Sequence, residues 1–252
     1  MPKASTIAEQ NAVEVPLYTV MDVARYLRLP TWAALAFSGR GPIHPEELFH
    51  QLMHQPFSSA SFADDSGFPR REGGNRRVSF HALASLFVRS FLFHLPQSQD
   101  RITAWSFEAA WEAFRFPEGE PSLFADPDPD RIVNQFERNG PWIAGRNHDE
   151  AVKLVALCLD RVELKDNIPV RLFPFSRDPS PDAPRFIVID PEVRFGRPTV
   201  KGAPTDVLAE RWRAGDSPES LAEDYDLTTD EVNESLRYES MPSRLPFPFF
   251  GW

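Results

Sequence analysis

Apolar and polar positions follow their clearest pattern in the last third of the chain. The run 186–190 (FIVID) is short, rich in β-branched residues and followed by proline, so it predicts a strand packed on a small core. Residues 195–204 place two glycines and two prolines around a brief apolar centre, which favours a tight ribbon or loop that leads into a helix. This part of the chain therefore carries its own local folding signals.

Three short helices are predicted to follow, each with its own start signal. The capping residues are Thr205 for the first helix, Ser217 with Pro218 for the second, and Thr228 with Glu231 as a capping box for the third. Gly215 offers a left-handed stop to the first helix. The apolar residues expected on the inward faces are Val207, Leu208, Trp212, Leu221, Ala222, Tyr225, Val232 and Leu236. Short helices joined by such tight turns predict a helix-turn-helix layout.

Upstream of residue 186 the pattern is also mainly helical. Thr19 and Asp22 form a capping-box-like pair before a helix, and a turn at 29–31 leads to a short second helix that ends near residue 38. Ser79 caps a helix that is apolar on most sides, so it is expected at the centre of the first domain or in a homodimer interface. Further expected elements are helices over 44–54, 105–114 and 149–162, a strand over 170–173 and an exposed Asp-Pro loop over 126–130.

The predicted fold is mainly α with small β-hairpins. At 252 residues the chain is long enough for two domains, an N-terminal winged helix-turn-helix-like domain and a smaller C-terminal trihelical helix-turn-helix domain. The predicted division is a flexible arm at 1–14, the first domain at 15–176, a linker at 177–185, the trihelical domain at 186–239 and a tail at 240–252.

Charge differs between the two predicted domains. The formal net charge is −10, yet residues 15–94 contain 8 arginines against 6 acidic residues, a difference of +2. Residues 186–239 contain 13 acidic against 6 basic residues, a difference of −7. Because DNA phosphates are bound by basic surfaces, the first half of the chain is the one expected to contact DNA.

The candidate DNA-binding residues are five arginines, Arg40, Arg70, Arg71, Arg76 and Arg77. Four of them flank two glycines in a predicted hairpin that can hold phosphate as a wing, although a solvated basic loop explains the same residues equally well. The predicted second helix of the N-terminal helix-turn-helix reads WAALAF over 32–37, without the polar side chains that usually reach base edges. Base readout therefore stays open.

The tail combines three prolines with large apolar side chains. Proline excludes a stable helix, and each buried aromatic side chain gains roughly 2 kcal/mol over exposure to water. The tail is therefore expected to occupy a groove, either on this chain, on a second copy or on a protein partner. The candidate partner-binding residues are Arg244, Leu245, Phe247, Phe249, Phe250 and Trp252.

The segment 196–239 (GRPTVKGAPTDVLAERWRAGDSPESLAEDYDLTTDEVNESLRYE) resembles the C-terminal domain of VapB-type antitoxins, which was long a domain of unknown function. The run 18–30 (YTVMDVARYLRLP) is similar to the N-terminal helix-turn-helix of that family, and residues 78–80 and 171–175 also fit its layout. The resemblance implies an antitoxin that neutralises a PIN-domain ribonuclease and usually binds its own operator DNA. It also implies an arginine inserted into the acidic pocket of the ribonuclease, for which Arg244 is the candidate.

Motifs for catalysis or cofactor binding are missing from the sequence. It has no nucleophile elbow, no phosphate-binding glycine loop and no dinucleotide fingerprint, and His50 with His54 lacks the HExxH order. We therefore expect no enzyme activity, no metal and no cofactor. The single cysteine, Cys158, is expected to be a buried apolar residue and fits a cytoplasmic protein, and no apolar run predicts membrane insertion. The alternative function is a stand-alone DNA-binding transcriptional regulator.

Overall fold

The computed structural model describes residues 13–29, 77–93, 122–139 and 147–241, and these are mainly helical with two small antiparallel strand pairs. The first part contains α2 (Val20–Leu27), α5 (Phe80–Phe93), the short helix η1 (Leu123–Ala125), α7 (Pro129–Asn139), α8 (His148–Leu159), β1 (Val162–Lys165) and β2 (Ile168–Leu172). The second part contains η2 (Arg194–Gly196), β3 (Thr199–Val200), β4 (Ala203–Pro204), α9 (Thr205–Arg213), α10 (Pro218–Tyr225) and α11 (Thr229–Ser240).

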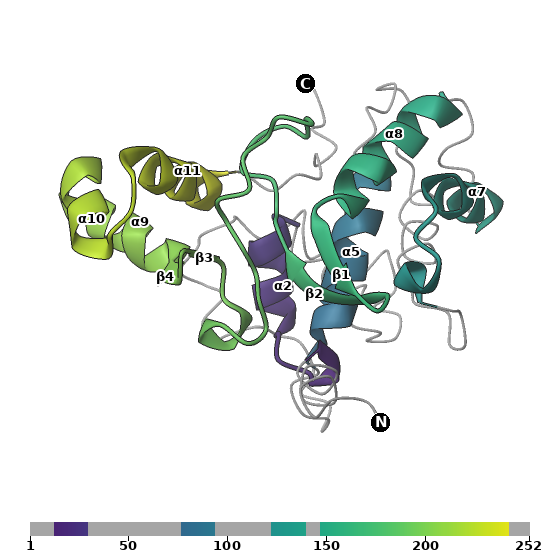
Figure 1. Cartoon of the computed structure of the whole chain (residues 1–252), viewed down its shortest axis with the longest axis horizontal. Helices are drawn as coiled ribbons and strands as arrows, with labels where there is room; N and C mark the ends of the chain where they lie inside the picture. Colours follow the sequence, from purple (N-terminus) through teal and green to yellow (C-terminus); the bar gives the residue numbers. More distant parts are fainter. Residues whose placement is uncertain (1–12, 30–76, 94–121, 140–146, 242–252) are drawn as a thin grey trace, which may run out of the picture.

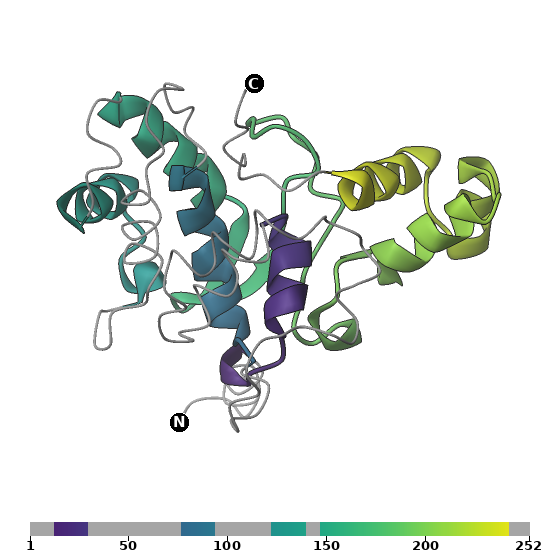
Figure 2. The same cartoon turned by 180° about the vertical axis from the view of Figure 1, so that it is seen from behind.

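These elements enclose two separate apolar cores. Figure 1 shows α5, α7, α8 and the β1–β2 hairpin on one side of α2, and α9, α10 and α11 on the other; Figure 2 shows the same order from behind. We call the elements around the first core the first unit and the elements around the second core the second unit. Helix α2 belongs to the first core and lies on the side of the first unit that faces the second.

Helix α5 lies at the centre of the first unit, as its apolar pattern predicts. Its start is capped by Ser79, whose Oγ accepts a hydrogen bond of 3.2 Å from the backbone N–H of Ala82. The fully buried apolar residues along it are Phe80, Leu83, Ala84, Leu86 and Val88, each 0% exposed. Cys158 of α8 is also buried, as predicted. A helix this apolar is stable only when other elements cover all its sides, and α8 and β2 pack on it.

The strand predicted over 170–173 is confirmed as β2, but the one predicted over 186–190 is wrong. Strand β2 pairs with β1 through a turn in which Asp166 and Asn167 both have positive φ. The run 186–190 makes only single bridges, from Ile189 to Leu172 and from Val188 to Thr199. It therefore connects the β1–β2 hairpin to the β3–β4 ribbon without forming a strand of its own.

Other predicted boundaries in the first unit need correction. The Asp-Pro loop predicted over 126–130 is partly helical, because α7 begins at Pro129 and the backbone N–H of Asp130 donates a 3.0 Å hydrogen bond to Asp128. The helix predicted over 149–162 ends at Leu159. Val13, predicted in a flexible arm, is 2% exposed in the first core. The helices predicted over 31–38, 44–54 and 105–114 lie outside the described residues.

The predicted linker 177–185 is fixed to the first unit by a buried arginine. Arg161 is 2% exposed, donates hydrogen bonds to the backbone oxygens of Ala183 and Pro184, and lies 4.4 Å from the ring centre of Phe175. Ala183 itself belongs to the first core. The segment is therefore held in place where its composition alone predicts a free connection.

The second unit confirms most of the predicted helix signals. Thr228 and Glu231 form the capping box of α11, Ser217 caps α10, and Gly215 follows α9 with a φ of 114°. Thr205 is a correction, because Pro204 occupies the N-cap position and Thr205 is the first helical residue. The hydroxyl of Thr205 is thereby free to donate a hydrogen bond to Glu239 of α11.

His148, at the start of α8, is expected to make the contact between α8 and α7 depend on pH. Its imidazole lies 2.9 Å from Asp130 and 3.0 Å from Glu137 of α7, and these hydrogen bonds raise its pKa to about 9. The pKa of a histidine in an unfolded chain is about 6.5. The contribution of the His148 contacts to the free energy of unfolding is therefore complete below about pH 6.5 and is lost as the pH rises through about 9.

An NMR titration of the His148 ring tests this directly. We expect a titration midpoint well above about pH 6.5. We also expect the unfolding free energy of the unaltered chain to lose the His148 contribution between about pH 6.5 and pH 9, and a His148→Gln chain to lack this loss. A midpoint at the ordinary histidine value would contradict the contact.

Candidate partner-binding site

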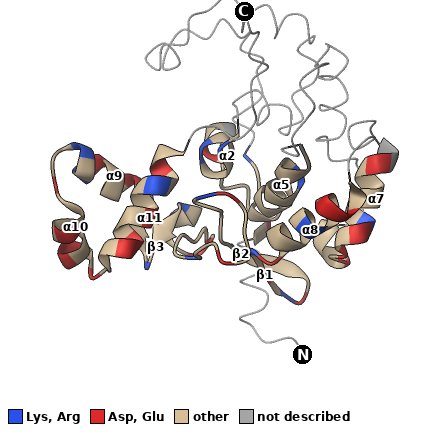
Figure 3. Ribbon diagram, turned by 90° about the horizontal axis from the view of Figure 1, so that it is seen from above, with Lys and Arg blue, Asp and Glu red and all other residues tan. Residues whose placement is uncertain are grey.

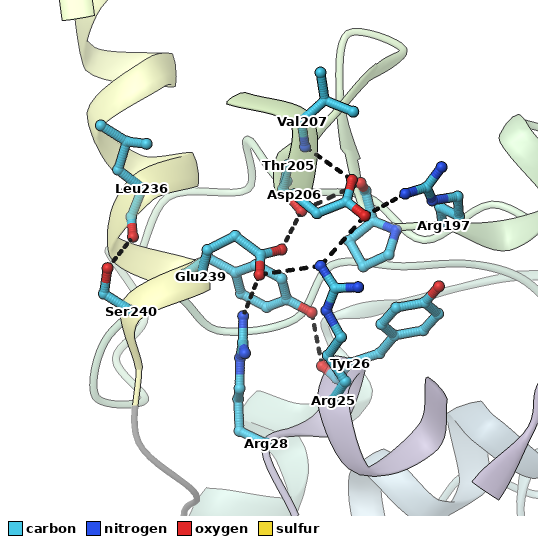
Figure 4. A network of polar contacts seen from close by, with 12 residues as sticks. Arg25, Tyr26, Arg28, Arg197, Thr205, Asp206, Val207, Leu236, Glu239 and Ser240 are labelled. Carbon is cyan, nitrogen blue, oxygen red and sulfur yellow. Dashed lines mark hydrogen bonds and ion pairs between the residues drawn. The ribbon is translucent and has the colours of Figure 1, made fainter. Parts of the chain in front are cut away.

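A network of charged and aromatic side chains joins α2 to the second unit. At its centre Glu239 of α11 accepts a 2.6 Å hydrogen bond from the hydroxyl of Thr205. Glu239 also pairs with Arg25 at 3.4 Å and Arg28 at 3.5 Å, both from α2 (Figure 4). The Glu239 side chain is only 6% exposed. A carboxylate this buried is stable when several donors surround it, so these contacts connect the two units firmly.

Asp206 adds a second carboxylate to the same network. It pairs with Arg25 at 3.3 Å and with Arg197, which precedes the β3–β4 ribbon (Figure 4). Burial raises the pKa of Asp206, but Arg197 and Arg25 outweigh this effect and lower it overall. Burial also lowers the pKa of Arg25, whereas Glu239 and Asp206 raise it to a greater extent. Both groups are therefore charged at neutral pH.

Two tyrosines complete the contact between the units. The hydroxyl of Tyr238 donates a 2.7 Å hydrogen bond to the backbone oxygen of Tyr26, and the Arg28 guanidinium lies 4.3 Å from the centre of the Tyr238 ring. Burial raises the pKa of Tyr26 to about 12. We call Arg25, Tyr26, Arg28, Arg197, Thr205, Asp206, Tyr238 and Glu239 the α2–α11 network.

The α2–α11 network bears on what α2 can bind. In a DNA-binding helix-turn-helix the first helix crosses the phosphate backbone, and basic side chains make such contacts. Here Arg25 and Arg28 are already paired with carboxylates of the second unit. Contact with DNA through these two arginines would therefore compete with the contact between the units.

A second buried carboxylate fixes the end of the first unit to α11. Glu234 is 2% exposed and accepts hydrogen bonds from the hydroxyl of Ser176 and from the guanidinium groups of Arg177 and Arg237. Burial raises the pKa of Glu234, but the bonds from Arg177 and Ser176 lower it overall. Glu234 therefore stays ionised, and two half-exposed arginines lie beside it at the surface.

These arginines line a groove of about 600 Å³ that is formed mainly by the second unit. Its lining combines aromatic, aliphatic and charged side chains: Arg177, Phe186, Trp212, Pro218, Asp230, Asn233, Glu234, Leu236, Arg237 and Ser240. Trp212 is 45% exposed and Phe186 39% exposed. Large aromatic residues left in water beside paired charges are typical of a surface that binds another protein segment.

Trp212 corrects the predicted buried face of α9. Leu208, one turn earlier, is 0% exposed in the second core, whereas Trp212 lies beyond that core and faces the groove. The helical spacing correctly predicts that the two residues share a side of the helix. The spacing does not predict how far the second core extends along α9, and Trp212 lies beyond the end of that core.

Acidic residues dominate the outer surface of the second unit. Figure 3 shows Asp and Glu along α10 and on α11, with fewer basic positions between them. Arginine side chains neutralise some of these carboxylates, as Arg211 does with Asp216 at 2.6 Å and Asp224 at 2.7 Å. An acidic surface repels phosphate, so this surface of the second unit is better suited to binding protein than DNA.

The structure places one of the residues proposed for partner or DNA binding. Arg77 is exposed and directly precedes Val78, which forms a bridge with Tyr18 beside α2. The remaining DNA-binding candidates, Arg40, Arg70, Arg71 and Arg76, lie outside the described residues. So do the tail candidates Arg244, Leu245, Phe247, Phe249, Phe250 and Trp252. The proposed roles of these residues in DNA binding and in partner binding stay predictions.

Among residues 13–29, 77–93, 122–139 and 147–241, no group of three or more His, Cys, Asp or Glu is placed to hold a metal ion. None of the helices that the structure describes is long and apolar enough to cross a membrane.

Comparison with known proteins gives a family match for the second unit. Residues 187–238 match a family described as "Protein of unknown function (DUF433)". The chain is also similar to the X-ray crystal structure of Rv2018 from Mycobacterium tuberculosis, with 19% sequence identity, a TM-score of 0.49, and coverage of 88% of this chain and 98% of that chain. No curated protein matches the chain. The family match covers the residues that build the second core.

Proposed function

We propose that the chain is the antitoxin of a type II toxin–antitoxin system. In this proposal it binds and neutralises a PIN-domain ribonuclease of the VapC type, and it binds its own operator DNA through the arginine-bearing first unit. Neutralisation is by occlusion: the chain covers the active site of the ribonuclease and makes or breaks no covalent bond. The resemblance of residues 196–239 to VapB-type antitoxins suggests the partner, and the family match supports only a coarser assignment, to a family of unknown function.

The observation that carries the proposal is the surface of the second unit. It combines exposed Trp212 and Phe186 with half-exposed arginines, and its helices α10 and α11 are acidic. This combination favours a protein partner over a nucleic acid, because aromatic residues and arginine dominate protein interfaces while carboxylates repel phosphate. The tail that follows α11 has the same chemistry, with one arginine among large apolar residues.

Co-expression with the PIN-domain ribonuclease encoded beside this chain tests the function. We expect the full chain to restore growth and to co-purify with the ribonuclease. Arg244→Ala is expected to weaken the complex by about 2 kcal/mol, or roughly 30-fold in Kd, because a guanidinium pairs bidentately with carboxylates in the acidic metal pocket of such an enzyme. A chain truncated after Glu239 should lose most of its neutralising activity.

Arg213→Ala is the matched control, because Arg213 is an exposed arginine of α9 that does not line the groove. Its Kd should equal that of the unaltered chain. Thermal unfolding of each variant checks that the second unit is folded. Unchanged neutralisation by both Arg244→Ala and the truncated chain would reject the assigned role of the tail.

A further inference from the structure

We infer that the groove on the second unit holds the chain's own tail, residues 242–252, when no partner is bound. The tail is the occupant that best fits the groove in position, in apolar character and in charge. The inference concerns the free chain, so it does not depend on the identity of the ribonuclease.

The first argument is position. Ser240, the last residue of α11, lines the groove, and Met241 follows it with an extended backbone at φ −63° and ψ 132°. The chain thus leaves α11 beside the groove in an extended conformation. An extended segment covers roughly 3.3 Å per residue, and one helical turn is about 5.4 Å long. Residues 242–252 are therefore long enough to run back along α11 as far as Asp230.

The second argument is apolar character. Phe186 and Trp212 come from different elements, the connection before β3 and helix α9, yet both line the same groove and are 39% and 45% exposed. Leu236 and Pro218 extend this apolar lining. The tail brings Phe247, Phe249, Phe250 and Trp252, spaced by prolines that favour an extended backbone. Covering both sets of aromatic side chains removes apolar surface from water on each side.

The third argument is charge. Glu234 is paired with Arg177 and Arg237, whereas Asp230 has no ion-pair partner within the part of the chain that the structure describes. Arg244 is the single charged residue of the segment 242–252. A guanidinium placed against Asp230 would give this carboxylate an ion-pair partner.

The alternative occupants of the groove are the tail of a second copy and a segment of the ribonuclease. The tail of the same chain has the advantage of attachment, since a short tether gives it an effective concentration on the order of millimolar. If the proposed function holds, the ribonuclease must displace the tail from the groove before it can be neutralised. Arg244 would then exchange Asp230 for the acidic pocket of the enzyme.

Limited proteolysis of the full chain, without ribonuclease, tests the inference. Chymotrypsin cleaves after Phe249 and Phe250, and mass spectrometry follows release of the end of the tail. We expect cleavage at least about tenfold slower than in a synthetic peptide of residues 240–252, because the rate follows the fraction of time the tail is undocked. Trp212→Ala and Asp230→Lys should each bring the rate close to that of the peptide.

Arg213→Ala again serves as the control and should leave cleavage slow. Trp212 and Asp230 are exposed, so both substitutions are expected to leave the second core intact, and thermal unfolding verifies this. Cleavage of the unaltered chain at the peptide's rate, or protection that survives both substitutions, would overturn the inference. Protection that grows with protein concentration would also overturn it, because the tail would then be held by a second copy.

Discussion

Replacing Gly196 by alanine is expected to lower the free energy of unfolding by about 3 kcal/mol or more. A Cβ atom at this position would lie 2.0 Å from the hydroxyl oxygen of Tyr18 and 2.6 Å from its Cζ. Gly196 also has a φ of 72°, in the left-handed region that costs other residues roughly 1 kcal/mol. The clash and the backbone strain therefore add.

Tyr18 has little room to move away from such a methyl group. It is 2% exposed, its ring lies 6.2 Å from that of Tyr26 and 6.4 Å from that of Phe80, and its backbone forms a bridge with Val78. Because Gly196 belongs to the connection that leads into the second unit, relief of the clash would have to separate this connection from the first core.

Gly202→Ala is the matched control for the Gly196 prediction. Gly202 has a φ of 85°, yet an added Cβ would meet no atom within 4 Å. This substitution should therefore show the backbone cost alone, about 1 kcal/mol. Urea unfolding followed by circular dichroism measures both values. Equal losses in the two variants would contradict the close approach of Gly196 to Tyr18.

Glu234→Gln is expected to cost about 2 kcal/mol at neutral pH. The amide keeps the shape of the side chain but removes the negative charge that holds Arg177 and Arg237, and Glu234 is almost fully buried. The two arginines are half exposed, so water compensates part of the loss. The contact between Ser176 and α11 should weaken, and amide hydrogen exchange in α11 should therefore become faster.

The pH dependence of this loss gives a second test. The pKa of Glu234 is lower in the folded chain than in the unfolded one, so its stabilisation is present above about pH 4.5 and is lost as the pH falls through the lowered folded value. Glu234→Gln should therefore approach the unaltered chain in stability under acid conditions. Glu223→Gln, an exposed position on α10, should change little at any pH. Parallel pH profiles for the unaltered chain and Glu234→Gln would contradict the account.

Signals that act within a few residues predicted the helices well. The capping boxes at Thr19 and Thr228, the Ser217 cap and the apolar surface of α5 all depend on neighbours in the sequence, and the structure has each of them. Thr205 was the exception, because its hydroxyl bonds to Glu239 of α11 in place of the start of its own helix. A distant partner outweighed the local capping preference.

The candidate site could not be predicted in the same way, because its residues come from distant parts of the chain. Glu239 meets Arg25 across 214 positions, and Glu234 meets Ser176 across 58. In the sequence both glutamates belong to the polar pattern of α11, where a solvent-facing position and a buried ion pair look alike. Trp212 likewise shares a side of α9 with buried Leu208, and it lines the groove because it lies beyond the second core.

The central claim is that this chain acts by covering a ribonuclease, and titration of purified full chain into the PIN-domain ribonuclease encoded beside it tests this most directly. With RNA cleavage as the readout and enzyme held well above the Kd, activity should fall linearly to zero at a fixed molar ratio and return when the complex is diluted or the chain is digested. Full cleavage at every ratio, or inhibition that depends on turnover by the chain, would contradict the account.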